Sequence, residues 1–260
     1  MNEISSRTNE TIRRVAALCA DAALRRAQGL CVVHGIKLCA EAARRTQLTA
    51  LYVTDNALKK YAREIAALGV EDMTLVSEPV LERIDPLRTP QGVVGVARLP
   101  QAAAPGELAA GRRILALCSV QDPANVGAAV RTAAALGYAG VALSDDCADL
   151  FSPKALRASM GAAFAVKRTI FADGAAFARF LSEEGVLCVA TALREDARPV
   201  TAVDTAGRLA LFIGNEGRGL SSDIINACGA CAVIPITGDV ESLNAGAAAA
   251  IAMWELRDGR

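Results

Sequence analysis

The chain has 260 residues, of which 53% are hydrophobic, and its 28 Lys and Arg balance its 28 Asp and Glu. That length suits one or two domains, and the longest apolar run, Ala245 to Trp254, falls short of the roughly 18 residues that span a bilayer. The polar start lacks the layout of a secretory signal, so we expect no secretory or membrane segment. Eight cysteines are present, and their single C-x-x-C (Cys228 to Cys231) has no histidine nearby, which predicts no zinc or other metal site. We therefore expect a reduced, cytoplasmic protein.

The first hundred residues alternate between helical and strand patterns, which predicts a compact α/β domain. This region carries 14 Lys and Arg against 11 Asp and Glu, a slight positive excess that permits an RNA-facing surface without requiring one. Its arginine pairs fit either solvated helix faces or RNA contacts. We expect helices at 1–29, 36–45 and 56–68 and strands at 30–33, 51–54, 73–76 and 93–99.

A proline- and alanine-rich segment, residues 101–111, predicts a linker. It separates a first domain, residues 1–100, from a second domain, residues 112–260. The alternating strand and helix patterns of the second domain predict an α/β fold with a mostly parallel sheet and helices on both faces. We expect its strands at 112–120, 140–144, 187–192, 209–213 and 231–235 and its helices at 125–137, 152–160 and 245–252.

The sequence of residues 209–220, LALFIGNEGRGL, joins a buried strand to three glycines at Gly214, Gly217 and Gly219. Glycine lets the backbone approach a ligand closely, so peptide N–H and C=O groups can contact a flat heterocycle. The spacing G-x-x-G-x-G is neither the dinucleotide fingerprint nor a phosphate-binding loop. A second short strand, a polar turn ending in Ser242-Leu243-Asn244 and a helix of small residues follow it. The glycine turn alone is equally consistent with an ordinary loop.

Together, the segments DPANVGAAVRTAAALG, FIGNEGRGL and IPITGDVESLNAGAAAAIAMWE resemble the three motifs of the SpoU (TrmH-type) ribose 2′-O-methyltransferases of the SPOUT superfamily. Residues 1–100 resemble the substrate-binding domain of this family, including its Thr89-Pro90-Gln91-Gly92 segment. The resemblance implies a ribosomal-protein-like RNA-binding domain and a catalytic domain with a trefoil knot. It also implies S-adenosylmethionine as methyl donor, RNA as substrate and a homodimer whose site is shared between subunits.

The resemblance implies a role for each matched position. Because a guanidinium is a poor proton acceptor, Arg131 is expected to bind a phosphate and stabilise charge, and Glu216 to orient Arg131 or Asn125. Ser242 and Asn244 serve either catalysis or capping of the last helix, and His34 either structure or RNA contact. The implied residues are Arg131, Asn125, Glu216, Ser242 and Asn244 for catalysis, Gly214, Asn215, Gly217, Ile234, Pro235 and Leu243 for the donor, and Arg131, Arg157 and His34 for RNA.

The chain departs from the family pattern after the last polar pair. Relatives commonly carry Asn-Val-Ser there, whereas this chain has Asn244-Ala245-Gly246. This difference bears on the turnover rate more than on donor binding, because the loops matched to the donor remain. The resemblance implies 2′-O-methylation of ribosomal RNA, because family members with this kind of N-terminal domain usually modify rRNA. The alternatives are the same chemistry on tRNA and a non-catalytic RNA-binding factor in ribosome assembly. An antibiotic-resistance role is a variant of the first.

Overall fold

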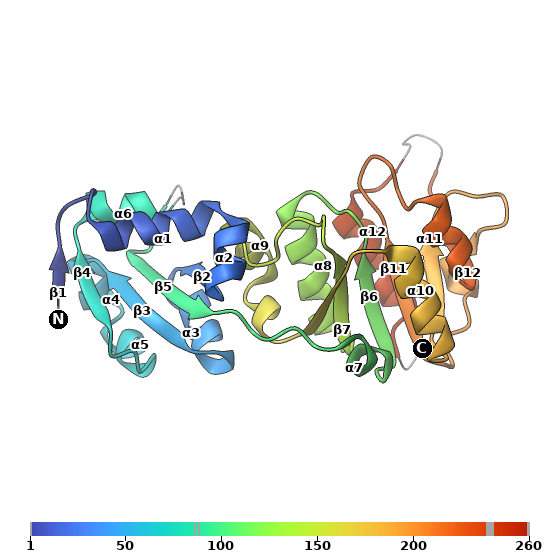
Figure 1. The fold of residues 1–260 in the computed structure, drawn as a ribbon, viewed down its shortest axis with the longest axis horizontal. Helices are drawn as coiled ribbons and strands as arrows, with labels where there is room; N and C mark the ends of the chain where they lie inside the picture. The colour runs from blue at the N-terminus through green and yellow to red at the C-terminus, as the bar shows by residue number, and fades with distance from the viewer. Residues whose placement is uncertain (1, 86, 88, 238–241, 259–260) are drawn as a thin grey trace. The chain divides into compact units, whose positions relative to one another are not determined.

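The structure is a computed structural model that describes residues 2–85, 87, 89–237 and 242–258. Its contacts divide the chain into two compact units (Figure 1). The N-terminal unit comprises residues 1–100 and 149–164, and the C-terminal unit comprises residues 101–148 and 165–260. Within the described ranges, every helix is too short or too polar to cross a membrane.

The N-terminal unit is built on a five-stranded mixed sheet. Its strands are β1 (Asn2–Ile4), β2 (Leu30–His34), β3 (Leu48–Val53), β4 (Met73–Val76) and β5 (Val93–Arg98), and its helices are α1 (Glu10–Ala20), α2 (Ala22–Gln28), α3 (Ile36–Arg45), α4 (Asp55–Lys60), α5 (Ala62–Ala67), α6 (Glu78–Ile84) and α9 (Pro153–Ser159). The strand order is β1-β4-β3-β5-β2, with β5 antiparallel to β2 and β3. This confirms the predicted α/β class.

Alternation along β5 separates the two faces of this sheet. Val94 and Val96 belong to the hydrophobic cluster that α1 and α6 form on one face. Gly95 points to the opposite face, where a Cβ would stand 2.9 Å from Cγ2 of Val33 and 3.1 Å from Sγ of Cys39 in α3. The glycine therefore lets α3 lie close to the sheet.

Four features of this unit differ from the predictions. The helix expected over residues 1–29 breaks at Asp21, where the backbone is extended. The side chain of Asp21 caps α2 by accepting hydrogen bonds from the N–H groups of Ala23 and Leu24. A strand, β1, precedes it. The helix expected at 56–68 divides at Tyr61 into α4 and α5, and α6 was missed. Periodicity does not register such breaks, because the apolar spacing continues across them.

The C-terminal unit contains a seven-stranded sheet in which every pair of neighbours is parallel. The strands are β6 (Arg113–Leu117), β7 (Gly140–Ser144), β8 (Lys167–Phe171), β9 (Leu187–Thr191), β10 (Arg198–Pro199), β11 (Leu209–Ile213) and β12 (Ala230–Val233), in the order β10-β12-β9-β11-β6-β7-β8; the helices are α7 (Pro105–Ala109), α8 (Pro123–Ala135), α10 (Gly174–Glu183), α11 (Ser222–Ala227) and α12 (Ala245–Glu255). The predicted parallel sheet is confirmed. α7 lies in the segment predicted as a linker, and β8, β10, α10 and α11 were missed.

Helices cover both faces of this sheet. α10 packs on one face, where the rings of Phe177 and Phe171 stack at 4.8 Å between centroids. α8 and α12 pack against each other, and the hydroxyl of Tyr138, just after α8, donates to the carbonyl of Met253 at 3.2 Å (Figure 1). All five residues of β11 are buried, as expected for a central parallel strand.

The end of the chain is held by a buried arginine. Arg113 is 2% exposed, and its guanidinium donates to the carbonyl oxygens of Leu256, Gly207 and Thr205 at 2.6, 2.7 and 2.5 Å. It also lies 3.0 Å from the carboxylate of Asp258. The trefoil knot implied by the resemblance stays a prediction, and Gly238 and Glu241 of the predicted polar turn lie outside the described residues.

Candidate active site

The glycine turn after β11 is closed by its own backbone. Asn215 and Gly219 exchange two backbone hydrogen bonds, of 3.1 and 2.9 Å. The amide oxygen of Asn215 accepts from the N–H groups of Gly217 and Arg218. A Cβ at Gly214 would stand 2.2 Å from the carbonyl carbon of Gly219, so no larger residue fits there. The turn is thus a rigid backbone surface.

This turn borders a cavity of about 530 Å³ at the carboxyl ends of β9, β11 and β12, the edge at which parallel α/β sheets bind ligands. Five predicted donor-binding residues line it, as do two predicted catalytic residues, Glu216 and Ser242. Pro235 is exposed and lies between two lining residues, Ile234 and Ile236, without lining the cavity itself. The five donor-binding residues are Gly214, Asn215, Gly217, Ile234 and Leu243.

Three predicted catalytic residues form one hydrogen-bonded chain. The amide nitrogen of Asn244 donates to the amide oxygen of Asn125 at 3.0 Å, and the amide nitrogen of Asn125 donates to Oε1 of Glu216 at 3.0 Å. Asn125 is 8% exposed, on α8. Asn244 also caps α12, because its amide oxygen accepts from the N–H of Ala247 at 3.1 Å. Capping and membership of this polar chain therefore coincide in one residue.

Glu216 joins the glycine turn to the segment that leads into α8. Its carboxylate accepts from the backbone N–H groups of Gln121 and Asp122, each at 3.1 Å, as well as from Asn125. Burial raises the pKa of Glu216, but these hydrogen bonds outweigh it and bring the pKa below its usual value. Of the two partners expected for Glu216, the structure places Asn125 beside it.

Arg131 stands apart from the hydrogen-bonded chain of Asn244, Asn125 and Glu216. It lies six residues along α8 from Asn125 and is exposed, and its side chain makes no hydrogen bond or ion pair with any described residue. Its guanidinium is thus available to an external anion.

The other two predicted RNA-binding residues lie in the N-terminal unit. Arg157, on α9, is exposed, whereas His34, at the end of β2, is partly buried. The Nε2 of His34 donates to the carbonyl of Ile84 at 2.8 Å. Burial lowers the pKa of His34, and the nearby carboxylate of Asp85 opposes this effect. A histidine with these contacts fits a structural role.

The part of the cavity that follows β9 was not predicted from the sequence. Residues 191–194 line it, and the hydroxyl of Thr191 donates to the carbonyl of Phe212 at 2.9 Å, which ties β9 to β11. A usable signal was present. Because neighbouring parallel strands end at the same edge, the residues after any central strand of this sheet are candidates for the site.

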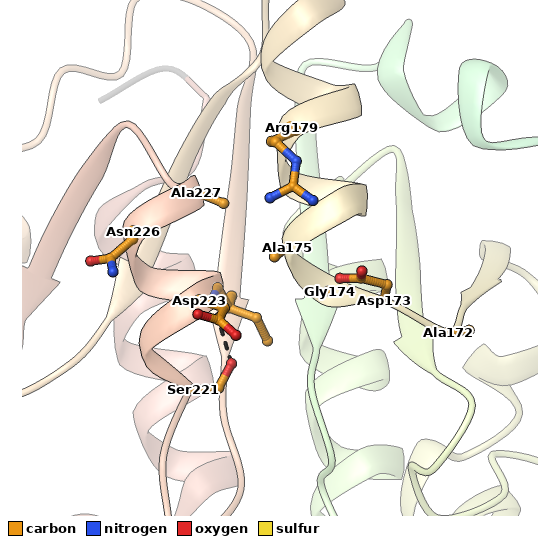
Figure 2. A pocket seen from close by; sticks show the side chains of 10 residues that line it. Ala172, Asp173, Gly174, Ala175, Arg179, Ser221, Asp223, Asn226 and Ala227 are labelled. Atoms are coloured by element: carbon orange, nitrogen blue, oxygen red, sulfur yellow. Dashed lines mark hydrogen bonds between the residues drawn. The ribbon is translucent and has the colours of Figure 1, made fainter.

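A larger hollow, of about 890 Å³, lies between α10 and α11 (Figure 2). Its exposed side chains are of mixed charge and include Arg179, Asp173 and Asp223. None of the predicted site residues lines it. The smaller cavity beside the glycine turn, which collects most of them, is therefore the candidate active site.

Comparison with protein families and curated proteins assigns relatives to both parts of the chain. Residues 112–254 match the SpoU rRNA Methylase family, and residues 9–95 match the MRM3-like substrate binding domain. The chain is 34% identical over 186 residues to the 23S rRNA (guanosine(2553)-2′-O)-methyltransferase RlmP of Bacillus subtilis, covering 70% of this chain and 71% of the relative. It is 36% identical over 146 residues to the 23S rRNA (guanosine-2′-O-)-methyltransferase RlmB of Acinetobacter baylyi, covering 55% and 58%.

Solved structures agree with these matches. An AdoMet-bound rRNA methyltransferase from Sinorhizobium meliloti superimposes with a TM-score of 0.84 at 29% identity, covering 98% of this chain and 97% of that one. The SpoU methyltransferase AviRb from Streptomyces viridochromogenes, in complex with AdoMet, superimposes with a TM-score of 0.84 at 25% identity, covering 95% and 97%. Both of these similar structures hold S-adenosylmethionine.

Proposed function

Because the chain belongs to the SpoU rRNA Methylase family, we propose that it transfers a methyl group from S-adenosylmethionine to the ribose 2′-oxygen of a guanosine in 23S rRNA. The observation that carries this proposal is the polar chain from Asn244 through Asn125 to Glu216 next to a cavity bounded by a glycine turn. The names of the two curated relatives support the choice of rRNA and guanosine. Family membership also confirms the resemblance drawn from the three sequence motifs.

The cavity suits the methyl donor. The close approach of Gly214 to Gly219 leaves bare backbone on one side, which fits an adenosine read through peptide groups. Ile234 and Leu243 add apolar surface around it. We propose that these residues, with Asn215 and Gly217, hold S-adenosylmethionine. When bound, it supplies a methyl group that its sulfonium already activates.

Asn125 and Glu216 prepare the protein for this reaction. Asn125 accepts from Asn244 with its oxygen and donates to Glu216 with its nitrogen, so its amide is fixed in one orientation. Glu216 is surrounded by donors, which keep it ionised and make it a weak base. We therefore infer that Glu216 positions Asn125 and the segment before α8 and does not take the proton of the 2′-hydroxyl.

Arg131 is the proposed charge-stabilising group. A guanidinium binds phosphate through two parallel N–H donors and stays protonated. Its place would be beside the phosphate of the target nucleotide, where its charge favours ionisation of the neighbouring 2′-hydroxyl.

Replacing Arg131 separates charge from geometry. We expect Arg131→Lys to lower the single-turnover rate about tenfold and Arg131→Ala by a further factor of about ten, because lysine keeps the charge without the bidentate donors. Arg179→Lys, at another exposed helical arginine, is the control. Near-normal activity of Arg131→Lys would remove the bidentate role.

Transfer of labelled methyl from S-adenosylmethionine to purified, unmodified rRNA and tRNA tests the function itself. A methylated ribose cannot attack its own phosphate, so alkaline cleavage skips the modified position. We expect one protected guanosine in 23S rRNA. Label on tRNA alone would keep the chemistry and refute the substrate. Absence of label from free rRNA, ribosomal subunits and tRNA would refute the function.

We also propose that the active protein is a homodimer. The small-residue face of α12, including Gly246, Ala249 and Ala252, is buried within the chain, so packing against α8 accounts for it. Ile251 and Trp254 remain exposed at 41% and 52% on the same helix. Exposed large apolar residues of this kind are typical of subunit interfaces.

Mixing inactive variants tests whether the site is shared. If Arg131 acts on the partner's donor cavity, co-expressed Arg131→Ala and Gly214→Val chains should form mixed dimers with one intact site each. Random pairing then restores about a quarter of the wild-type sites. Monomers by light scattering, or no recovery in purified mixed dimers, would contradict the shared site.

The remaining assignments concern the whole chain. We propose that residues 1–100 bind the RNA substrate and residues 112–260 carry out the reaction, with residues 101–111 linking the two domains. In this proposal Arg157 also contacts the RNA, and His34 has a structural role. The match of residues 9–95 to a substrate binding domain supports this division. An rRNA substrate and eight cysteines outside disulfide bonds fit a cytoplasmic protein.

A further inference from the structure

Ser119 holds an unusual backbone conformation in the segment between β6 and α8. Its φ is 56°, and Met160 is the only other described non-glycine residue with a positive φ. Such a conformation is unfavourable in a non-glycine residue, so surrounding contacts must maintain it. Ser119 follows β6 and lies two residues before Gln121, whose N–H binds Glu216. The strained turn thus sets the direction in which the chain enters α8.

Asp146, in the turn after β7, is the centre of the contacts that hold Ser119. Its Oδ2 accepts from the hydroxyl of Ser119 at 2.6 Å, and its Oδ1 accepts from the hydroxyl of Ser144 at 2.5 Å. The oxygen of Ser144 accepts in turn from the N–H of Ser119 at 2.7 Å. The carbonyl of Asp146 accepts from the side chain of Gln121 at 2.8 Å. One residue therefore contacts Ser119 and Gln121 directly and Ser119 again through Ser144.

The carbonyl of Ser119 is held from the opposite side by the glycine turn. It accepts from the side-chain nitrogen of Asn215 at 2.8 Å and from that of Gln121 at 3.0 Å. The strained residue is thus fixed between the turn after β7 and the turn after β11. Hydrogen bonds from Ser119 and Ser144 also lower the pKa of Asp146, so its carboxylate stays charged at neutral pH.

We infer that Asp146 is a positioning residue for methyl transfer: through Ser119 and Ser144 it fixes the strained turn that presents the backbone of Gln121 and Asp122 to Glu216 and so aims Asn125. This inference rests on the proposed function. Asp146 lies outside the three sequence motifs and does not line the donor cavity. Its effect is therefore on the rate of the reaction and not on donor binding.

Single-turnover rates and calorimetry of S-adenosylmethionine binding test this role on the full-length protein. Asp146→Asn keeps one acceptor oxygen and Asp146→Ala keeps none, so we expect rates about threefold and at least tenfold below wild type, respectively. The dissociation constant of the donor is expected to stay within about twofold. Asp145→Asn, at the exposed preceding residue, is the matched control and should behave as wild type.

Hydrogen exchange of peptides covering residues 119–127 supplies a readout that needs no activity. We expect faster exchange there in both Asp146 variants and in Ser119→Ala, which leaves Asp146 in place, and unchanged exchange in Asp145→Asn. If Asp146→Ala unfolds early, Ser119→Ala carries the test. Wild-type rates or unchanged exchange in the folded variants would overturn the inference. If the wild-type protein methylates no RNA but the variants still exchange faster, the proposed function is refuted, while the role of Asp146 in holding the turn is retained.

Discussion

Glu216 is surrounded by hydrogen-bond donors, which makes its charge part of the site's geometry. Its two oxygens accept from Asn125, Gln121 and Asp122. Glu216→Gln turns one oxygen into a donor that must face another donor, so we expect methyl transfer to fall at least about tenfold. Single-turnover assays check this, with Glu183→Gln, at an exposed glutamate of α10, as the control. A rate within about twofold of wild type would show that the charge is unnecessary.

The same carboxylate predicts a pH dependence of stability. Because the pKa of Glu216 is lower in the folded protein than in the unfolded chain, its stabilisation is fully present above the unfolded value of about 4.3. It is lost as the pH falls through the folded pKa. The Tm difference between wild type and Glu216→Gln should stay constant from about pH 5.5 to 8 and narrow below about pH 4. A difference that grows on acidification would contradict this sign.

Gly246 tests the departure from the family pattern. A Cβ there would stand 3.2 Å from the amide oxygen of Asn244 and 3.3 Å from that of Asn125, so both asparagine side chains must shift slightly. We expect Gly246→Ala to slow methyl transfer about threefold, and Gly246→Ser to recover most of this because its hydroxyl can donate to these oxygens. Ala247→Ser, at the exposed next position, is the control. Equal rates for the alanine and serine variants would exclude a role for the hydroxyl.

At the scale of elements, Arg113 joins β6 to the chain end and to the loop before β11. Its guanidinium donates to the carbonyls of Leu256, Gly207 and Thr205 while 2% exposed. Arg113→Met leaves these acceptors unpaired, so we expect the free energy of unfolding to fall by about 3 kcal/mol or more. Urea denaturation measures this. Arg112→Met, at a neighbour whose side chain is 61% exposed, should cost about 1 kcal/mol or less.

Most elements could be predicted from the sequence because their apolar patterns are local. β4, β7, β11 and α3 begin and end at their predicted residues. The failures have local causes too. Asp21 caps a new helix inside one continuous apolar period. α7 begins at Pro105, in the first helical position, which proline favours, inside a segment whose composition indicated a linker.

The site was predictable only as far as its motifs reach. The motifs indicated Asn125, Glu216 and Asn244, and the structure connects them. The contacts of Ser119 with Asp146 were not visible, because they join the ends of two strands through a backbone conformation that composition does not encode. Strand order decides which ends meet, and strand order is a property of the whole fold.

At the scale of the molecule, the compact units do not follow the sequence boundary. Residues 149–164 lie within the sequence of the predicted catalytic domain, yet they belong to the N-terminal unit. Arg25 shows how they are attached. Its side chain is 3% exposed, its Nε lies 2.6 Å from Oδ2 of Asp149, and it also donates to the carbonyls of Leu18 and Cys19. A buried charge from one part of the chain thus depends on a carboxylate from another.

Breaking this pair should weaken the N-terminal unit although the change lies in the other part of the sequence. Asp149→Asn leaves the buried guanidinium of Arg25 without its counter-charge, so we expect a loss of about 3 kcal/mol in urea denaturation. Hydrogen exchange should then accelerate in α1, α2 and β2 and stay unchanged in β6, β9 and β11. Adding Arg25→Met should recover part of the loss, because the pair is then removed together. Asp145→Asn is the control. Faster exchange confined to β6, β9 and β11 would contradict the attachment of residues 149–164 to the N-terminal unit.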